Sequence, residues 1–71
     1  MANNTANLSR QMAQLASRVN LETRLSLIEV MNGVTSFDDL PEKYQRWYND
    51  PDTIPEANLS YAAKMARKTK E

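Results

Sequence analysis

Apolar residues recur at steps of three and four positions along the first half of the chain, and neither Gly nor Pro interrupts residues 8–32. We call this set the N-terminal stripe; it consists of Leu8, Met12, Leu15, Val19, Leu21, Leu25, Ile28 and Met31. Side chains at this spacing share one face of an α-helix, so the segment predicts an amphipathic helix. A helix of this kind must bury its apolar face against other elements, which here favours an all-α fold.

One irregularity, the step of two from Val19 to Leu21, leaves the continuity of this helix open. Either the stripe slips by one position within a single helix, or the chain bends at Asn20, a residue type that caps helix starts. Because no Gly or Pro occurs there, we favour one long helix, which would measure roughly 37 Å at a rise of about 1.5 Å per residue. Gly33 is the expected stop after its last turn.

Two shorter helices are expected in the second half of the chain, each with a proline in its first turn. The first contains Pro41 and ends at the turn-forming residues 49–52. The second begins near Pro55 and ends in several cations, which are favourable at a helix C-terminus. The sequence therefore predicts one all-α domain over residues 1–71, with two short helices folded back on a long one and residues 1–7 frayed.

The composition excludes several classes of function. The 71 residues contain neither His nor Cys, so the commonest general base, the commonest metal ligand and all disulfides are absent. Nine Lys and Arg balance nine Asp and Glu, so bulk charge does not favour binding to nucleic acid. We therefore expect no enzyme, no cofactor and no metal ion.

The apolar content is modest, since Leu, Val, Ile and Phe provide 13 of the 71 residues. A lone core of this size rarely supplies more than about 3–5 kcal/mol, and small proteins often compensate by associating. Two short helices also cover only part of a roughly 37 Å rod, so part of the N-terminal stripe should stay exposed as an interface. The expected partner-binding residues on the stripe are Leu8, Met12, Leu15 and Val19. The expected core comprises Leu25, Ile28, Phe37, Trp47 and Leu59.

An aromatic group provides a second candidate surface. Tyr44, Trp47 and Tyr48 lie at positions i, i+3 and i+4 and therefore share one helix face. Trp and Tyr bring large contact areas and a polar group, which suits a partner-binding site. The alternative is ordinary core packing, which we favour because a small domain gains most by burying its single Trp.

A basic helix end supports an alternative function in nucleic-acid binding. The candidate residues are Tyr61, Lys64, Arg67, Lys68 and Lys70. The cations could contact phosphates while the Tyr stacks on a base, although four cations are few for this purpose. Residues 36–56 hold six acidic residues against two basic ones, so the acidic middle and the basic end are expected to attract each other, within the fold or between copies.

No leader or membrane segment is visible. Residues 1–5 have neither a basic nor an apolar segment, and no apolar run approaches the roughly 20 residues of a membrane span. We therefore expect a cytoplasmic protein with no membrane partner. No motif identifies a family; in length and in its Cys-free composition the chain is similar to small phage accessory or inhibitor proteins.

These observations predict a non-catalytic protein–protein interaction or assembly module that acts through an amphipathic helix stripe. Its expected partners are another protein, a second copy of the chain, or both. The alternative is a nucleic-acid-associated module that uses the C-terminal basic helix.

Overall fold

The fold of the chain is helical throughout the part that the computed structural model describes, which is residues 4–70 for the backbone and residues 7–69 for the side chains. Four α-helices occupy this part: α1 (Asn4–Ala16), α2 (Leu21–Met31), α3 (Glu42–Asn49) and α4 (Tyr61–Lys70). Short 3-10 helices lie between them at Phe37–Asp39, Pro51–Thr53 and Glu56–Asn58. Within residues 4–70 there is no β-strand, so the predicted all-α class is confirmed.

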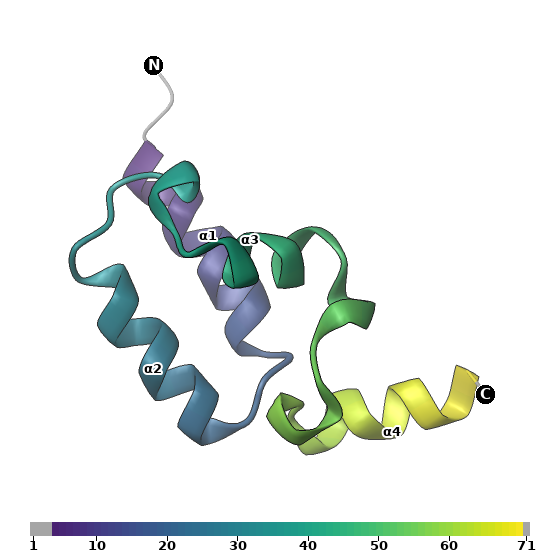
Figure 1. Ribbon diagram of the computed structural model, residues 1–71. Helices are drawn as coiled ribbons and strands as arrows, with labels where there is room; N and C mark the ends of the chain where they lie inside the picture. Colours follow the sequence, from purple (N-terminus) through teal and green to yellow (C-terminus); the bar gives the residue numbers. More distant parts are fainter. Residues whose placement is uncertain (1–3, 71) are drawn as a thin grey trace.

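The predicted long N-terminal helix is wrong, because the chain breaks between Ala16 and Leu21 and α2 folds back beside α1 (Figure 1). Asn20 caps α2, and its Oδ1 accepts a hydrogen bond from the Thr23 N–H at 2.9 Å. Its side-chain Nδ2 donates to the Ala57 carbonyl at 2.8 Å, which ties the bend to the segment that precedes α4. The step of two in the N-terminal stripe therefore marks a bend and not a slip within one helix.

The start of the chain also differs from the prediction. The helix α1 begins at Asn4, four positions before the expected start at Leu8. Residues 4–7 are thus helical, fraying of this first turn stays a prediction, and residues 1–3 lie outside the described residues.

The segment between α1 and α2 pairs with the segment that precedes α4. Val19 and Leu59 form an isolated antiparallel bridge, and the Asn20 N–H donates to the Asn58 carbonyl at 2.8 Å. The Asn58 Nδ2 donates to the Thr23 Oγ1 at 2.9 Å, which ties this contact to the first turn of α2. As a result α2 and α4 begin close together and point away from each other (Figure 1).

Arg24 closes the C-terminal end of α1. Its Nε donates to the Ala16 carbonyl at 3.0 Å and one Nη donates to the Val19 carbonyl at 3.2 Å. Carbonyl groups at a helix end have no partner within the helix, and a cation there is also favourable for the helix dipole. The guanidinium of Arg24 therefore stabilises the bend between the two helices.

The core lies where α1 meets α2 and α3. It contains Leu8, Met12, Leu15, Val19, Leu27, Leu40, Tyr44, Trp47, Ile54 and Leu59. The two predicted halves of the N-terminal stripe are reversed: Leu15 and Val19 are fully buried, whereas Leu25 and Ile28 are exposed. Because α2 folds back on α1, the face of α2 that packs into the core is not the predicted one. Leu27 is buried there, whereas the predicted core residues Leu25 and Ile28 face solvent.

Candidate protein-binding surface

Three large aliphatic side chains face solvent along α2. Leu21 is 65% exposed, Leu25 is 56% exposed and Ile28 is 50% exposed. They lie at positions i, i+4 and i+7, so they share one helix face, which we call the α2 stripe. The opposite face carries the buried residues Thr23 and Leu27, so α2 has an apolar face toward the core and another toward solvent. Single exposed apolar residues are ordinary, but three on one face are typical of an interaction surface.

One flank of the α2 stripe is acidic. Glu22 and Glu29, both exposed, follow Leu21 and Ile28 by one position each, which places the two carboxylates on the same side of the helix. The other flank carries Arg24, whose guanidinium is held by the carbonyls at the end of α1. The charge that the α2 stripe offers to a partner is therefore negative.

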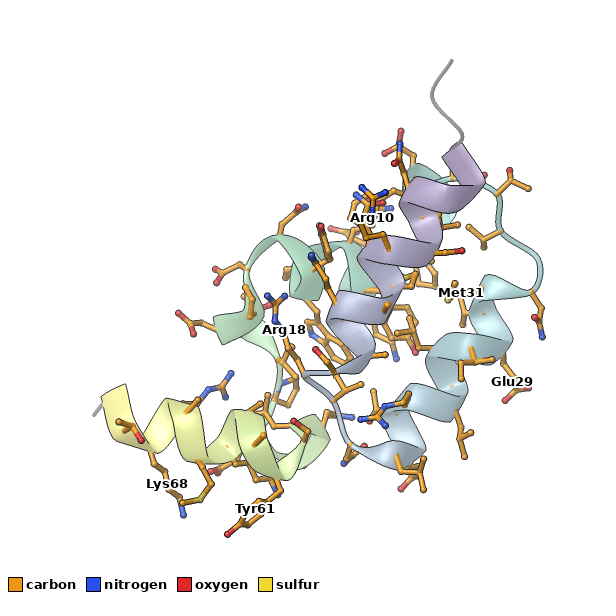
Figure 2. The ribbon with its side chains drawn as sticks, turned by 180° about the vertical axis from the view of Figure 1, so that it is seen from behind. Arg10, Arg18, Glu29, Met31, Tyr61 and Lys68 are labelled. Carbon is orange, nitrogen blue, oxygen red and sulfur yellow. The ribbon has the colours of Figure 1, made fainter. Side chains whose placement is uncertain are left out.

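A second exposed surface lies on α4. Tyr61 is 79% exposed, Met65 is 45% exposed, and Lys68 is also exposed. These residues repeat the spacing i, i+4 and i+7, and we call them the α4 face. Figure 2 shows the side chains of Tyr61 and Lys68 pointing the same way, away from the rest of the molecule. The α4 face thus combines an apolar surface with a cation.

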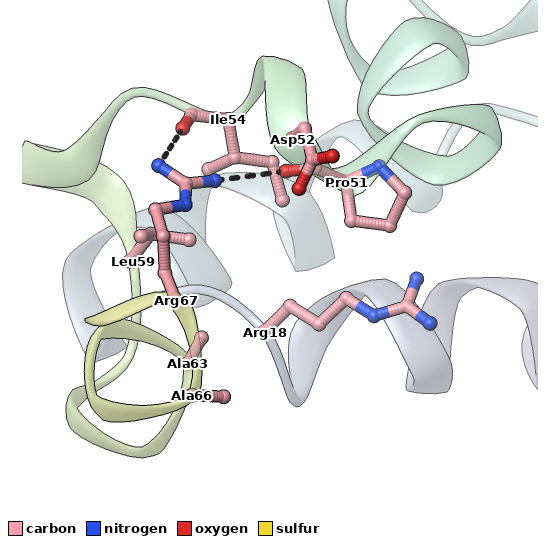
Figure 3. Close-up of a pocket in the computed structure, with 8 residues that line it drawn as sticks. All are labelled: Arg18, Pro51, Asp52, Ile54, Leu59, Ala63, Ala66 and Arg67. Atoms are coloured by element: carbon pink, nitrogen blue, oxygen red, sulfur yellow. Dashed lines mark hydrogen bonds between the residues drawn. The ribbon is translucent and has the colours of Figure 1, made fainter. Parts of the chain in front are cut away.

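Arg67 points the other way and is part of the structure of the chain. Its Nη1 donates to the Ile54 carbonyl at 3.0 Å, and its Nη2 donates to the Pro51 carbonyl at 3.1 Å (Figure 3). These two bonds hold α4 against the 3-10 helix Pro51–Thr53. Of the predicted nucleic-acid residues, Arg67 is therefore turned inward, Tyr61 and Lys68 are exposed, Lys64 is half-buried, and the Lys70 side chain lies outside the described residues.

A cleft lies between α4, the 3-10 helix Pro51–Thr53 and the segment that follows α1 (Figure 3). Its volume is about 290 Å³, and its lining residues are Arg18, Pro51, Asp52, Ile54, Leu59, Ala63, Ala66 and Arg67. Its charged groups are two guanidinium groups and one carboxylate. Arg67 already uses two of its N–H groups for backbone carbonyls. The cleft is therefore lined by charged groups of both signs and by apolar side chains. Its lining residues do not place a general base next to a nucleophile.

The predicted aromatic group divides between the core and its edge. Tyr44 and Trp47 are buried, with ring centroids 5.4 Å apart in an edge-to-face arrangement. Tyr48 is half-buried; its ring packs 5.4 Å from that of Phe37, and its hydroxyl donates to the Gln14 Oε1 at 3.2 Å. The preferred interpretation of Trp47 as core is confirmed. Tyr44 and Trp47 are too deeply buried to form an exposed partner-binding surface.

The predicted binding residues of the N-terminal stripe are also buried. Leu8, Met12, Leu15 and Val19 are each at most 3% exposed. The expectation that the rest of the chain leaves them uncovered is wrong, because α2 and α3 both pack against α1. Sequence reasoning missed the α2 stripe as a surface, although apolar residues on both faces of residues 21–31 could have indicated it.

Comparison of the chain with protein-family models, with curated proteins and with solved structures finds no match. Within residues 4–70, no helix has both the length and the apolar character needed to cross a membrane. The described part of the chain also contains no group of three or more acidic, His or Cys side chains arranged to hold a metal ion.

Proposed function

We propose that the chain is a non-catalytic protein–protein interaction module of the cytoplasm and that its contact surface is the α2 stripe. The observation that carries this proposal is the exposure of Leu21, Leu25 and Ile28 on a single helix face. A surface of this kind is suited to bind the apolar face of a helix in a partner, because apolar side chains at the same spacing can pack against each other.

The size of the α2 stripe sets the expected strength of binding. Covering the exposed part of each aliphatic side chain contributes on the order of 1 kcal/mol. Association has its own cost in translational and rotational freedom, so three such side chains support weak binding by themselves. The acidic flank with Glu22 and Glu29 adds selectivity and faster association toward a partner with cations beside its apolar face.

The alternative, a nucleic-acid-associated module, has less support. It relied on a continuous basic surface on α4, but Arg67 is held by two backbone carbonyls and faces the body of the molecule. Met65 also occupies the centre of the α4 face, where a phosphate contact would require a cation. The exposed surface of α4 therefore suits an apolar partner better than a sugar–phosphate backbone.

The proposal is tested by placing a charge in the centre of the α2 stripe. Tagged wild-type chain, Leu25→Glu and a control, Ser26→Glu, are used to capture proteins from the native host. Ser26 is exposed and lies outside the α2 stripe, so both variants add one carboxylate to the same helix. We expect a partner that wild type and Ser26→Glu retain and that Leu25→Glu loses. Identical capture by all three would contradict the proposal.

A further inference from the structure

We propose that the α2 stripe of one copy binds the α4 face of a second copy, so that the chain self-associates. This inference rests on the proposed function, because it names the partner of the α2 stripe. It starts from the match between the two exposed surfaces. Each presents a row of side chains at positions i, i+4 and i+7, aliphatic on α2 and Tyr61, Met65 and Lys68 on α4.

The charges beside the two surfaces are complementary. Glu22 and Glu29 flank the α2 stripe, whereas Lys64 and Lys68 lie beside Tyr61 and Met65. Viewed along each helix from its N-terminus, the two glutamates lie clockwise of the exposed apolar residues of α2. In the same view of α4, the two lysines lie counter-clockwise of Tyr61 and Met65. Opposite sides meet when two helices run parallel, as in parallel coiled coils. Parallel docking of α2 on α4 therefore brings the carboxylates next to the ammonium groups.

Pairing of two α2 stripes is less favourable. In an antiparallel pair about a two-fold axis, the same flank of each helix meets its counterpart, so Glu22 and Glu29 of one copy face those of the other. In a parallel pair the glutamates face the flank of Arg24, whose guanidinium is already bound to the Ala16 and Val19 carbonyls. Among the described helices, only α4 offers the α2 stripe exposed apolar side chains together with the exposed cation Lys68 and the half-buried Lys64.

The contact must form between copies. Within one copy α2 and α4 begin together at the bridge between Val19 and Leu59 and then point apart, so α4 cannot lie along its own α2 (Figure 1). Because α2 of one copy meets α4 of the next, the contact joins two different surfaces and leaves one of each surface open on the pair, so further copies can add through the same contact.

The test combines sedimentation with reversal of the flanking charges. One variant carries Glu22→Lys and Glu29→Lys, the other carries Lys64→Glu and Lys68→Glu, and Asp38→Lys serves as a control at an exposed position outside both surfaces. Circular dichroism checks that each variant remains helical. We expect wild type and the control to self-associate and each reversed variant to self-associate about tenfold more weakly at low salt.

An equimolar mixture of the two reversed variants tests which helices meet. Each variant alone opposes like charges at the contact between α2 and α4, whereas the mixture pairs opposite charges there, so we expect mixed complexes as strong as those of the wild type. Self-association that Leu25→Glu weakens and charge reversal leaves unchanged would overturn the α4 assignment. A wild type that stays monomeric would overturn self-association altogether, but partner capture dependent on Leu25 would then still support the proposed function.

Discussion

At the scale of single residues, Arg67 shows how one side chain decides between two interpretations of the same sequence. A cation near a helix C-terminus is equally compatible with phosphate binding and with a structural role. Its two bonds to the Ile54 and Pro51 carbonyls assign it the structural role. Its neighbour Lys68 is exposed and belongs to the α4 face. Adjacent cations on one helix therefore serve different purposes, and burial separates them where charge alone does not.

Removal of the Arg67 guanidinium is expected to destabilise the fold. Arg67→Ala leaves two carbonyls without their donor. A hydrogen bond that involves a charged group contributes about 1.5–3 kcal/mol to stability. Because the site is half-buried, we expect a loss of about 2 kcal/mol in the free energy of unfolding, measured by urea denaturation. Lys68→Ala is the control and, in dilute samples in which the α4 face does not contact a second copy, should change the free energy by less than about 0.5 kcal/mol. Equal effects of the two substitutions would contradict the role assigned to Arg67.

Asn20 has a comparable role at the bend. Asn20→Ala removes the cap of α2 and the side-chain bond to Ala57, so we expect a loss of about 1–2 kcal/mol. The exposed Asn32, which follows α2, provides a control of the same residue type. Asn32→Ala should lower the urea midpoint much less than Asn20→Ala. Similar midpoints for the two variants would show that Asn20 does not stabilise the bend.

At the scale of elements, the helices could be predicted from the sequence, but the way in which they face each other could not. The periodicity of the N-terminal stripe, Pro41 and the final cations correctly indicated helices. The expected helix start near Pro55 is wrong, because Pro55 precedes the 3-10 helix Glu56–Asn58 and α4 begins only at Tyr61. The bend was signalled by the step from Val19 to Leu21, but part of its stability comes from hydrogen bonds to Ala57 and Asn58, which are far away in the sequence. Once the chain bends, packing against α1 decides which face of α2 is buried. Local periodicity offered two apolar faces and could not choose between them.

Two neighbouring positions of α2 test which face is buried. Leu27 is 1% exposed and Ile28 is 50% exposed. Leu27→Ala should cost about 2–5 kcal/mol because it leaves a cavity in the core. Ile28→Ala should cost less than about 1 kcal/mol, since its side chain is half in water already. Urea denaturation of dilute samples measures both. A larger loss for Ile28→Ala would mean that the other face of α2 is buried.

At the scale of the whole molecule, the bend converts a sequence with one long stripe into a molecule with a core and two outer surfaces. Apolar residues on both faces of residues 21–31 pointed to an exposed surface, but the sequence could not show which face, because the site consists of the residues that are not needed for the core. The first half of the stripe fills the core with Trp47 and Leu59, which leaves the α2 stripe outside. The α4 face is exposed for a related reason, since Arg67 and Ala63 take the inward side of that helix. The two remaining surfaces match in spacing and in charge.

The central claim is that these two surfaces, and no others, meet between copies of the chain. Nuclear magnetic resonance tests it directly when amide shifts are followed through a dilution series of the wild-type protein. We expect concentration-dependent shifts along residues 21–29 of α2 and 61–68 of α4 together, with small changes in α1 and α3. Shifts confined to α2, shifts centred on α1 or α3, or spectra independent of concentration would contradict the account.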